Sequence, residues 1–113
     1  MTKYKNTLQK GSVRYIIFRE NEAWYAAGLE FNIVESGSTP LEANMLLIEA
    51  LSGYVESAKK IKSRPNILNQ KVDHEYEQMW QNIQNNKSEQ IKNVYSSGQF
   101  NMNQVLRGSL VSA

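Results

Sequence analysis

The segment Thr39-Pro40-Leu41-Glu42 has the features of a helix start. Thr39 can accept a backbone N–H group as the N-cap, and Glu42, three residues later, can complete a capping box. Pro40 at the first helical position has no N–H to leave unpaired, and its φ angle already suits a helix. We therefore predict a helix that begins at this point.

Apolar residues recur at helical spacing after this start, in two adjoining rows. One row is Leu41, Met45, Ile48 and Val55, and the other is Leu47, Leu51, Tyr54, Ala58 and Ile61. Together they make the broad apolar face that a helix needs in order to pack on a sheet. We predict that this face is buried.

Extended segments precede the helix. Residues 13–19 and 24–29 are rich in β-branched and aromatic side chains and are predicted strands, joined by a polar hairpin turn at 20–23. Residues 30–35 alternate polar and apolar side chains, which fits either a third strand or a continuation of the second. Residues 36–38 end the extended chain.

The second half has weaker signals. Residues 63–71 are a predicted loop with room for a short strand at 67–68, and Asp73 is the predicted N-cap of a second helix that ends near residue 85. Its apolar stripe is Tyr76, Met79, Trp80 and Ile83. Residues 91–95 are a strand candidate, which we expect to stop at Ser-Ser-Gly 96–98.

These elements predict an α+β fold: a small antiparallel sheet of three to four strands, a long helix packed on one face, and a second, C-terminal helix. A chain of 113 residues is long enough for one domain. We expect a flexible basic arm at 1–12, the domain at 13–100 and a frayed tail at 101–113.

Charge is divided along the chain. From Glu20 to Ala58 the sequence has no lysine or arginine, yet it holds seven glutamates: Glu20, Glu22, Glu30, Glu35, Glu42, Glu49 and Glu56. The net charge of +2 therefore hides a basic–acidic–basic pattern. An acidic surface repels phosphate backbones and attracts cations, so this pattern favours a protein partner.

Several classes of function are disfavoured by composition. The chain has no cysteine, which excludes disulfides and thiolate chemistry. Asp73 and His74 are its one aspartate and one histidine, so we expect no catalytic carboxylate set, no metal site, no cofactor and no enzymatic activity.

No apolar run approaches the ~20 residues of a membrane span, and the N-terminus lacks a secretory signal. We expect a cytoplasmic protein without membrane contact.

Residues 13–58 resemble the HicB family of antitoxins. In that family an aromatic strand and turn precede a segment like L-E-L-x-I-x-S-x-G-x-T-x-E-E-A, and the following helix ends in E-A-L. Here residues 29–34 match the strand, 37–39 match the break and cap, 41–43 open the helix, and Glu-Ala-Leu 49–51 follows. The similarity covers about the first half of the chain.

The resemblance implies a truncated RNase H-like sheet and a non-catalytic antitoxin of a type II toxin-antitoxin system. Such antitoxins bind a small basic toxin, HicA, which resembles a double-stranded-RNA-binding domain and cuts messenger RNA. Many also carry a C-terminal DNA-binding motif. After residue 65 this chain has one amphipathic helix, not two helices joined by a tight turn, so no DNA-binding motif is recognisable.

For toxin binding, we expect Glu22, Glu30 and Glu35 to supply steering and rim contacts, and Trp24 or Tyr25 to be the anchor. One alternative is a nucleic-acid-binding regulator that uses the basic segments 3–14 and 59–71. Its contacts would be Lys59, Lys60, Lys62 and Arg64. Another is a self-associating structural domain, a homodimer or higher homo-oligomer, paired through an open strand edge.

Overall fold

The computed structural model describes residues 11–60, 68–85, 93–102 and 105. In chain order the elements are β1 (Ser12–Glu20), β2 (Ala23–Gly28), the 3-10 helix η1 (Leu29–Phe31), β3 (Ile33–Gly37), α1 (Pro40–Lys60), α2 (His74–Asn85) and β4 (Val94–Asn101). The four strands form one antiparallel sheet in the order β3-β2-β1-β4. The predicted α+β class, with its long helix and second helix, is confirmed.

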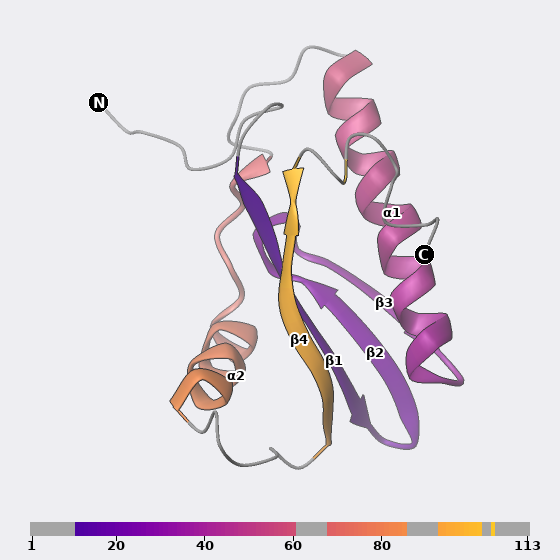
Figure 1. The fold of residues 1–113 in the computed structure, drawn as a ribbon, viewed down its shortest axis with the longest axis vertical. Coiled ribbons are helices and arrows are strands. Elements are labelled where there is room, and N and C mark those ends of the chain that lie inside the picture. Colours follow the sequence, from indigo (N-terminus) through magenta and orange to yellow (C-terminus); the bar gives the residue numbers. More distant parts are fainter. Residues whose placement is uncertain (1–10, 61–67, 86–92, 103–104, 106–113) are drawn as a thin grey trace.

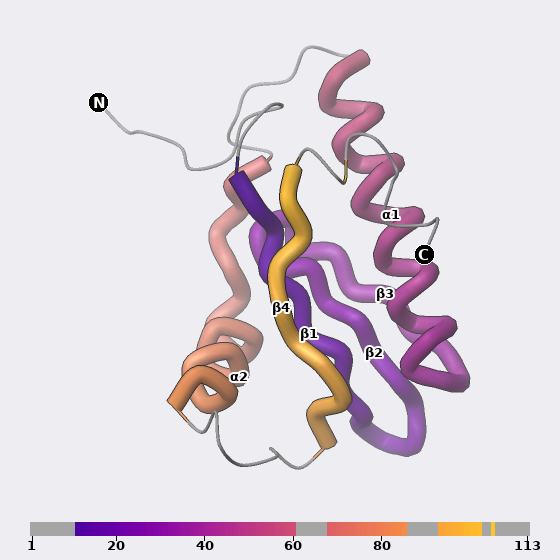
Figure 2. Tube along the Cα trace, in the orientation of Figure 1, coloured from indigo at the N-terminus to yellow at the C-terminus, as the bar shows by residue number. Residues whose placement is uncertain are grey.

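The two helices lie on opposite faces of the sheet, as Figures 1 and 2 show. Under α1, the core joins Leu47, Leu51 and Val55 to Val13, Ile17 and other buried residues. Under α2, Trp80 closes a smaller cluster with Ile16, Phe18, Ala27 and Leu29. Alternate residues of β1 therefore enter different cores, which is why its sequence is apolar without a break from Tyr15 to Phe18.

The turn between β1 and β2 consists of two residues, Asn21 and Glu22, as the polar segment 20–23 predicts. Their φ angles are 52° and 66°, the positive pair that a type I′ hairpin turn requires. Asparagine tolerates this conformation well, whereas glutamate adopts it at a cost. The hairpin is therefore formed with a strained second turn residue.

Residues 30–35 are not a continuation of β2. The chain leaves β2 at Gly28, makes the single turn of η1, and reverses at Asn32, whose φ angle is 53°. β3 then returns antiparallel to β2, with Trp24 opposite Gly37. Of the two interpretations that the alternation allowed, the third strand is confirmed.

Both helices begin where their caps predict. Thr39 Oγ1 accepts the N–H of Glu42 at 3.0 Å, and the Glu42 carboxylate accepts the N–H of Ser38 at 2.9 Å, one residue before the N-cap. At α2, Asp73 Oδ1 accepts the N–H of Glu75 at 2.9 Å. Each helix thus starts with side-chain partners for its otherwise unpaired N–H groups.

Part of the predicted apolar face of α1 is not buried. Leu41 and Met45 are 67% and 54% exposed, although Ile48 and Val55 of the same row are in the core. The buried side of α1 is centred on Leu47 and Leu51. The row that contains Leu41 and Met45 lies at the margin of this side, and its residues are buried only where the sheet extends beneath them. The prediction of burial is wrong for these two residues.

The prediction that the last strand stops at residues 96–98 is also wrong. β4 continues through Ser96, Ser97 and Gly98 to Asn101, paired with β1 along its length. Gly98 is covered by Tyr15, because a Cβ atom added to Gly98 would lie 2.9 Å from the Tyr15 hydroxyl. The aromatic ring protects the position where glycine lacks a side chain.

The segment 101–113 is not frayed throughout. Asn101 belongs to β4, and Met102 and Val105 are buried in the α1 core. The rest of this predicted tail lies outside the described residues. So do most of the predicted basic arm, Ile61, residues 63–67 of the loop, and the start of the strand candidate at 91–92.

Candidate protein-binding surface

The five residues predicted to bind a partner lie in different places. Glu22 is exposed in the hairpin turn, and Trp24 lies beside it on the α1 face of the sheet. Tyr25 points to the opposite face and stacks on Phe18, with ring centroids 5.6 Å apart. Glu35 is half-buried on β3, and Glu30 lies in η1. Glu35 is paired with Ala26 and Gly37 with Trp24, so Glu35 and Trp24 are diagonal neighbours on the same face of the sheet, with Glu22 in the adjoining turn. The fold therefore brings these three together and separates Tyr25 and Glu30 from them.

Glu30 is held inside the molecule by Arg14. Its carboxylate accepts the Arg14 Nε–H at 2.6 Å and the Arg14 backbone N–H at 2.7 Å. The two terminal nitrogens of Arg14 donate to Glu77 on α2, at 2.9 and 2.8 Å. The guanidinium also lies 5.4 Å from the centre of the Trp80 ring. This network joins β1, η1 and α2.

These contacts determine the protonation of Arg14. The hydrogen bonds that Arg14 donates to Glu77 and Glu30 raise the pKa of its guanidinium above the ordinary value, more than partial burial lowers it. Arg14 is thus a fixed cation whose charge is balanced by two carboxylates. Arg14 is the cation of the basic segment 3–14 that the structure describes. Its guanidinium binds Glu30 and Glu77 within the fold, so it is not available for contact with nucleic acid.

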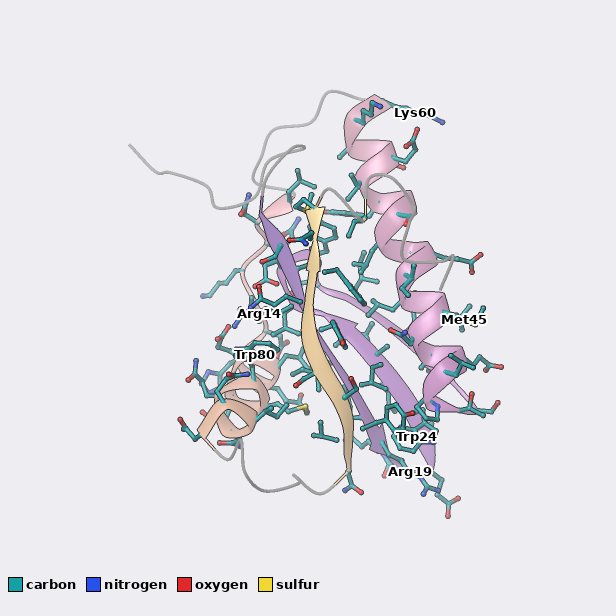
Figure 3. All side chains as sticks on the ribbon, viewed as in Figure 1. Arg14, Arg19, Trp24, Met45, Lys60 and Trp80 are labelled. Carbon is teal, nitrogen blue, oxygen red and sulfur yellow. The ribbon has the colours of Figure 1, made fainter. Side chains whose placement is uncertain are left out.

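A small cluster of aromatic and cationic side chains lies at the hairpin end of the sheet. Tyr95 meets Trp24 edge-on at 5.8 Å between ring centroids, and the Arg19 guanidinium lies 5.9 Å from the centre of the Trp24 ring. Tyr95 is 64% exposed. Figure 3 shows Arg19 and Trp24 together at this end. Trp, Tyr and Arg are the residue types most enriched at binding hot spots.

The outer side of α1 carries an acidic stripe, which we define as Glu42, Met45, Glu49 and Glu56. These residues are spaced by three, four and seven positions, so they lie along one side of the helix, and all are exposed. Leu41 adjoins the stripe. Figure 3 shows Met45 on the side of α1 that faces away from the sheet. The next cations along the helix are Lys59 and Lys60, in its last turn.

The beginning of the stripe, at Glu42 and Met45, lies at the same end of the molecule as the hairpin cluster. α1 begins at Pro40, three residues after Gly37, and Gly37 is the direct neighbour of Trp24 in the sheet. The exposed side chains of Leu41 and Met45 therefore lie on α1 beside the carboxylates of Glu42 and Glu49, and Glu22 is exposed in the turn that precedes Trp24. Apolar contact area with an acidic rim suits a partner that is itself cationic.

The described residues line at least two open clefts. One, of about 310 Å³, lies between the edge of β3 and the start of α2 and is lined by Ala27, Val34, Lys71 and Tyr76, among others. The second, of about 550 Å³, surrounds the Arg14 network and Gln99. In the part of the chain that the structure describes, no three His, Asp or Glu side chains converge as metal ligands do.

Of the four residues proposed to contact nucleic acid, two are among those that the structure describes. Lys59 and Lys60 are exposed at the end of α1. Lys62 and Arg64 lie outside the described residues. No described helix has the length and apolarity to cross a bilayer.

The sequence alone does not identify four residues of this candidate binding surface, which are Arg19, Leu41, Met45 and Tyr95. Leu41 and Met45 belong to the apolar row of α1 for which the sequence predicts burial. The signal that could have distinguished Met45 is its place among Glu42, Glu49 and Glu56 on one side of the helix. Tyr95 gives no such local signal, because its neighbour Trp24 is seventy-one residues away in sequence.

Comparison of the chain with protein-family models, with curated proteins and with solved structures finds no match.

Proposed function

We propose that this protein acts by binding another protein, and specifically that it is a HicB-like antitoxin that neutralises a small basic RNA-cleaving toxin. The observation that carries the proposal is the exposed acidic stripe of α1 with its apolar residues Leu41 and Met45. The resemblance of residues 13–58 to HicB antitoxins supplies the class of partner.

The stripe suits a basic partner for two reasons. Its three carboxylates lie on one side of α1, and no lysine or arginine occurs between Glu20 and Ala58 to offset them. Such a one-sided field accelerates encounter with a cation. Met45 and Leu41 then supply the apolar area that an interface core requires and that charge alone does not provide.

The hairpin cluster extends this surface. Trp24 and Tyr95 offer rigid aromatic area at low entropic cost, and Glu22 adds an exposed carboxylate at the rim. Glu30 does not belong to this surface, because both of its oxygens accept hydrogen bonds from Arg14. In this proposal the anchors are Trp24 and Met45, and the steering charges are Glu22, Glu49 and Glu56.

The test uses the small basic protein encoded beside this chain in its native genome. Co-expression should relieve its toxicity, and the purified pair should form a complex whose affinity falls with rising salt. Glu49→Gln with Glu56→Gln should weaken binding about threefold to tenfold at low salt, since each exposed ion pair contributes ~0.2–1 kcal/mol. Met45→Ser should weaken it roughly tenfold.

The matched control is Gln78→Lys with Asn85→Lys on α2. It changes the net charge by the same two units, at exposed positions on the opposite side of the sheet. Equal weakening by both pairs of substitutions would show a nonspecific charge effect and reject the stripe as the binding surface. Absence of any complex with a basic neighbour would reject the antitoxin proposal.

A further inference from the structure

β4 leaves a long edge of the sheet without a strand neighbour among the described residues. It spans eight residues and pairs with β1 on one side only. Its sequence, VYSSGQFN, contains no charged residue and no proline, which are the usual means of protecting an edge strand from pairing. The opposite edge strand, β3, has five residues and carries Glu35.

The hydrogen bonding between β1 and β4 shows which backbone groups of β4 point outward. Met102 donates its N–H to the carbonyl of Gly11 at 3.0 Å, so this pair is a hydrogen-bonded one. In an antiparallel ladder such pairs alternate with non-bonded ones. Gly98 and Phe100 therefore face β1 with their N–H and C=O groups, whereas Ser97 and Gln99 direct theirs to the open edge.

We propose that two copies of this chain associate by antiparallel pairing of their β4 strands about a two-fold axis at Gly98, which joins their sheets into one. In this register Ser97 of one copy lies opposite Gln99 of the second. Each of these pairs exchanges two N–H to C=O hydrogen bonds, so four outward groups on each strand find partners. This interface is separate from the acidic stripe and goes beyond the proposed toxin binding.

The side chains near the axis are compatible with this pairing. Gly98 has no side chain, and the ring of Tyr15 lies over it while stacking on Phe100 at 4.4 Å. The two-fold axis therefore places two such aromatic pairs side by side on one face. Ser97 and Gln99 meet on the other face as complementary hydrogen-bonding side chains.

Charge also favours β4 over β3 as the edge that meets a second copy. Two-fold pairing of β3 would bring Glu35 close to its own counterpart, because β3 is only five residues long. Pairing of β4 brings no like charges together. A second copy of the chain is thus the occupant that this edge accepts without electrostatic penalty.

The first test is the mass of the intact chain in solution, by sedimentation or light scattering. We expect twice the 13.0 kDa chain mass at concentrations of about 100 μM. Gln99→Pro removes an outward N–H but no hydrogen bond to β1, so the folded monomer should persist and the dimer dissociation constant should rise at least tenfold. Gln99→Ala is the matched control, since it also loses the hydrogen bond from Ser12 but keeps the N–H.

A cysteine cross-link tests the register and covers the case in which the proline variant fails to fold. The natural chain has no cysteine, so each single substitution introduces one thiol, and any disulfide must join two chains through the introduced thiols. Ser97→Cys mixed with Gln99→Cys should form a disulfide faster than either variant alone, because bonded partners are ~5.5 Å apart and diagonal ones ~7–8 Å. A monomeric mass, a dimer unaffected by Gln99→Pro, or equal cross-linking in all three samples would overturn the proposal.

Discussion

Arg14 on β1 and Glu77 on α2 form a bidentate ion pair, in which each terminal guanidinium nitrogen donates to a different carboxylate oxygen. The two residues are sixty-three positions apart in sequence. Arg14 also binds Glu30 and lies beside Trp80 of α2. Arg14 therefore ties α2 to β1 and η1, in addition to the packing of Trp80 in the smaller core.

Replacing Arg14 should loosen this arrangement. We expect Arg14→Ala to lower the free energy of unfolding by about 2 kcal/mol, because it leaves two partly buried carboxylates close together without a cation. Arg14→Lys should recover less than half of the loss, since an ammonium cannot make the paired bonds. Urea unfolding measures both. Arg19→Ala, at an exposed cation, is the control and should cost about 0.5 kcal/mol. Equal losses for Arg14→Ala and Arg19→Ala would contradict a structural role for the network.

The stability of the protein should fall at alkaline pH, in part through Tyr76. Burial raises the pKa of its phenol above 10.0, with smaller contributions from the charges of Glu75 and Asp73. Above pH 10 the unfolded chain releases this proton while the folded chain retains it, so stability is lost as pH rises. Tyr76→Phe should match the natural protein at pH 8 and lose less stability by pH 11.

Other groups titrate in the same range, so the difference between the two proteins is the informative quantity. Tyr95→Phe removes an exposed hydroxyl and is the control. Thermal unfolding at pH 8, 10 and 11 provides the comparison. Parallel stability curves for the natural protein and Tyr76→Phe would show that this phenol does not contribute.

A glycine at position 22 of the hairpin turn should stabilise the protein. Glu22→Gly removes the Cβ atom from a position with a φ angle of 66° and creates the Asn-Gly pair that type I′ turns favour. We expect a gain of about 0.5–1 kcal/mol, as relief of backbone strain exceeds the entropic cost of glycine. Glu22→Ala keeps the Cβ atom and should bring no gain. If alanine stabilises as much as glycine, the cause is lost charge, not relieved strain.

The start of α1 depends on one hydroxyl. Thr39→Ala removes the acceptor for the N–H of Glu42 and should cost about 1 kcal/mol, whereas Thr39→Ser should retain most of the stability. Chemical denaturation of the three proteins gives the values. A cost shared by alanine and serine would point to the lost methyl group instead of the cap.

The sequence predicts those features of the fold whose interacting residues are close together in the chain. The caps at Thr39 and Asp73 involve partners within three residues, and the turn at Asn21 and Glu22 connects two adjacent strands. Such features depend on short-range geometry, which residue type and spacing express directly. For this reason the starts of both helices and the first hairpin agree with the structure.

Features that depend on distant partners could not be predicted in this way. Ser96, Ser97 and Gly98 look like a break in the chain, and only pairing with β1 and cover by Tyr15 make them a strand. Glu30 looks like a free surface carboxylate until Arg14 is placed beside it. The exposure of Met45 likewise depends on how far the sheet reaches beneath α1. In each case tertiary contact overrides local preference.

The position of β4 has a consequence for synthesis of the chain on the ribosome. β1 is an inner strand of the finished sheet, yet one of its neighbours is made some eighty residues later. Until residue 101 has emerged, the nascent chain displays β1 as an edge strand, with Tyr15 and the other apolar side chains of its centre incompletely covered. Truncated products that end before β4 should therefore aggregate, and this sheet should reach its native state only after β4 has emerged from the ribosome.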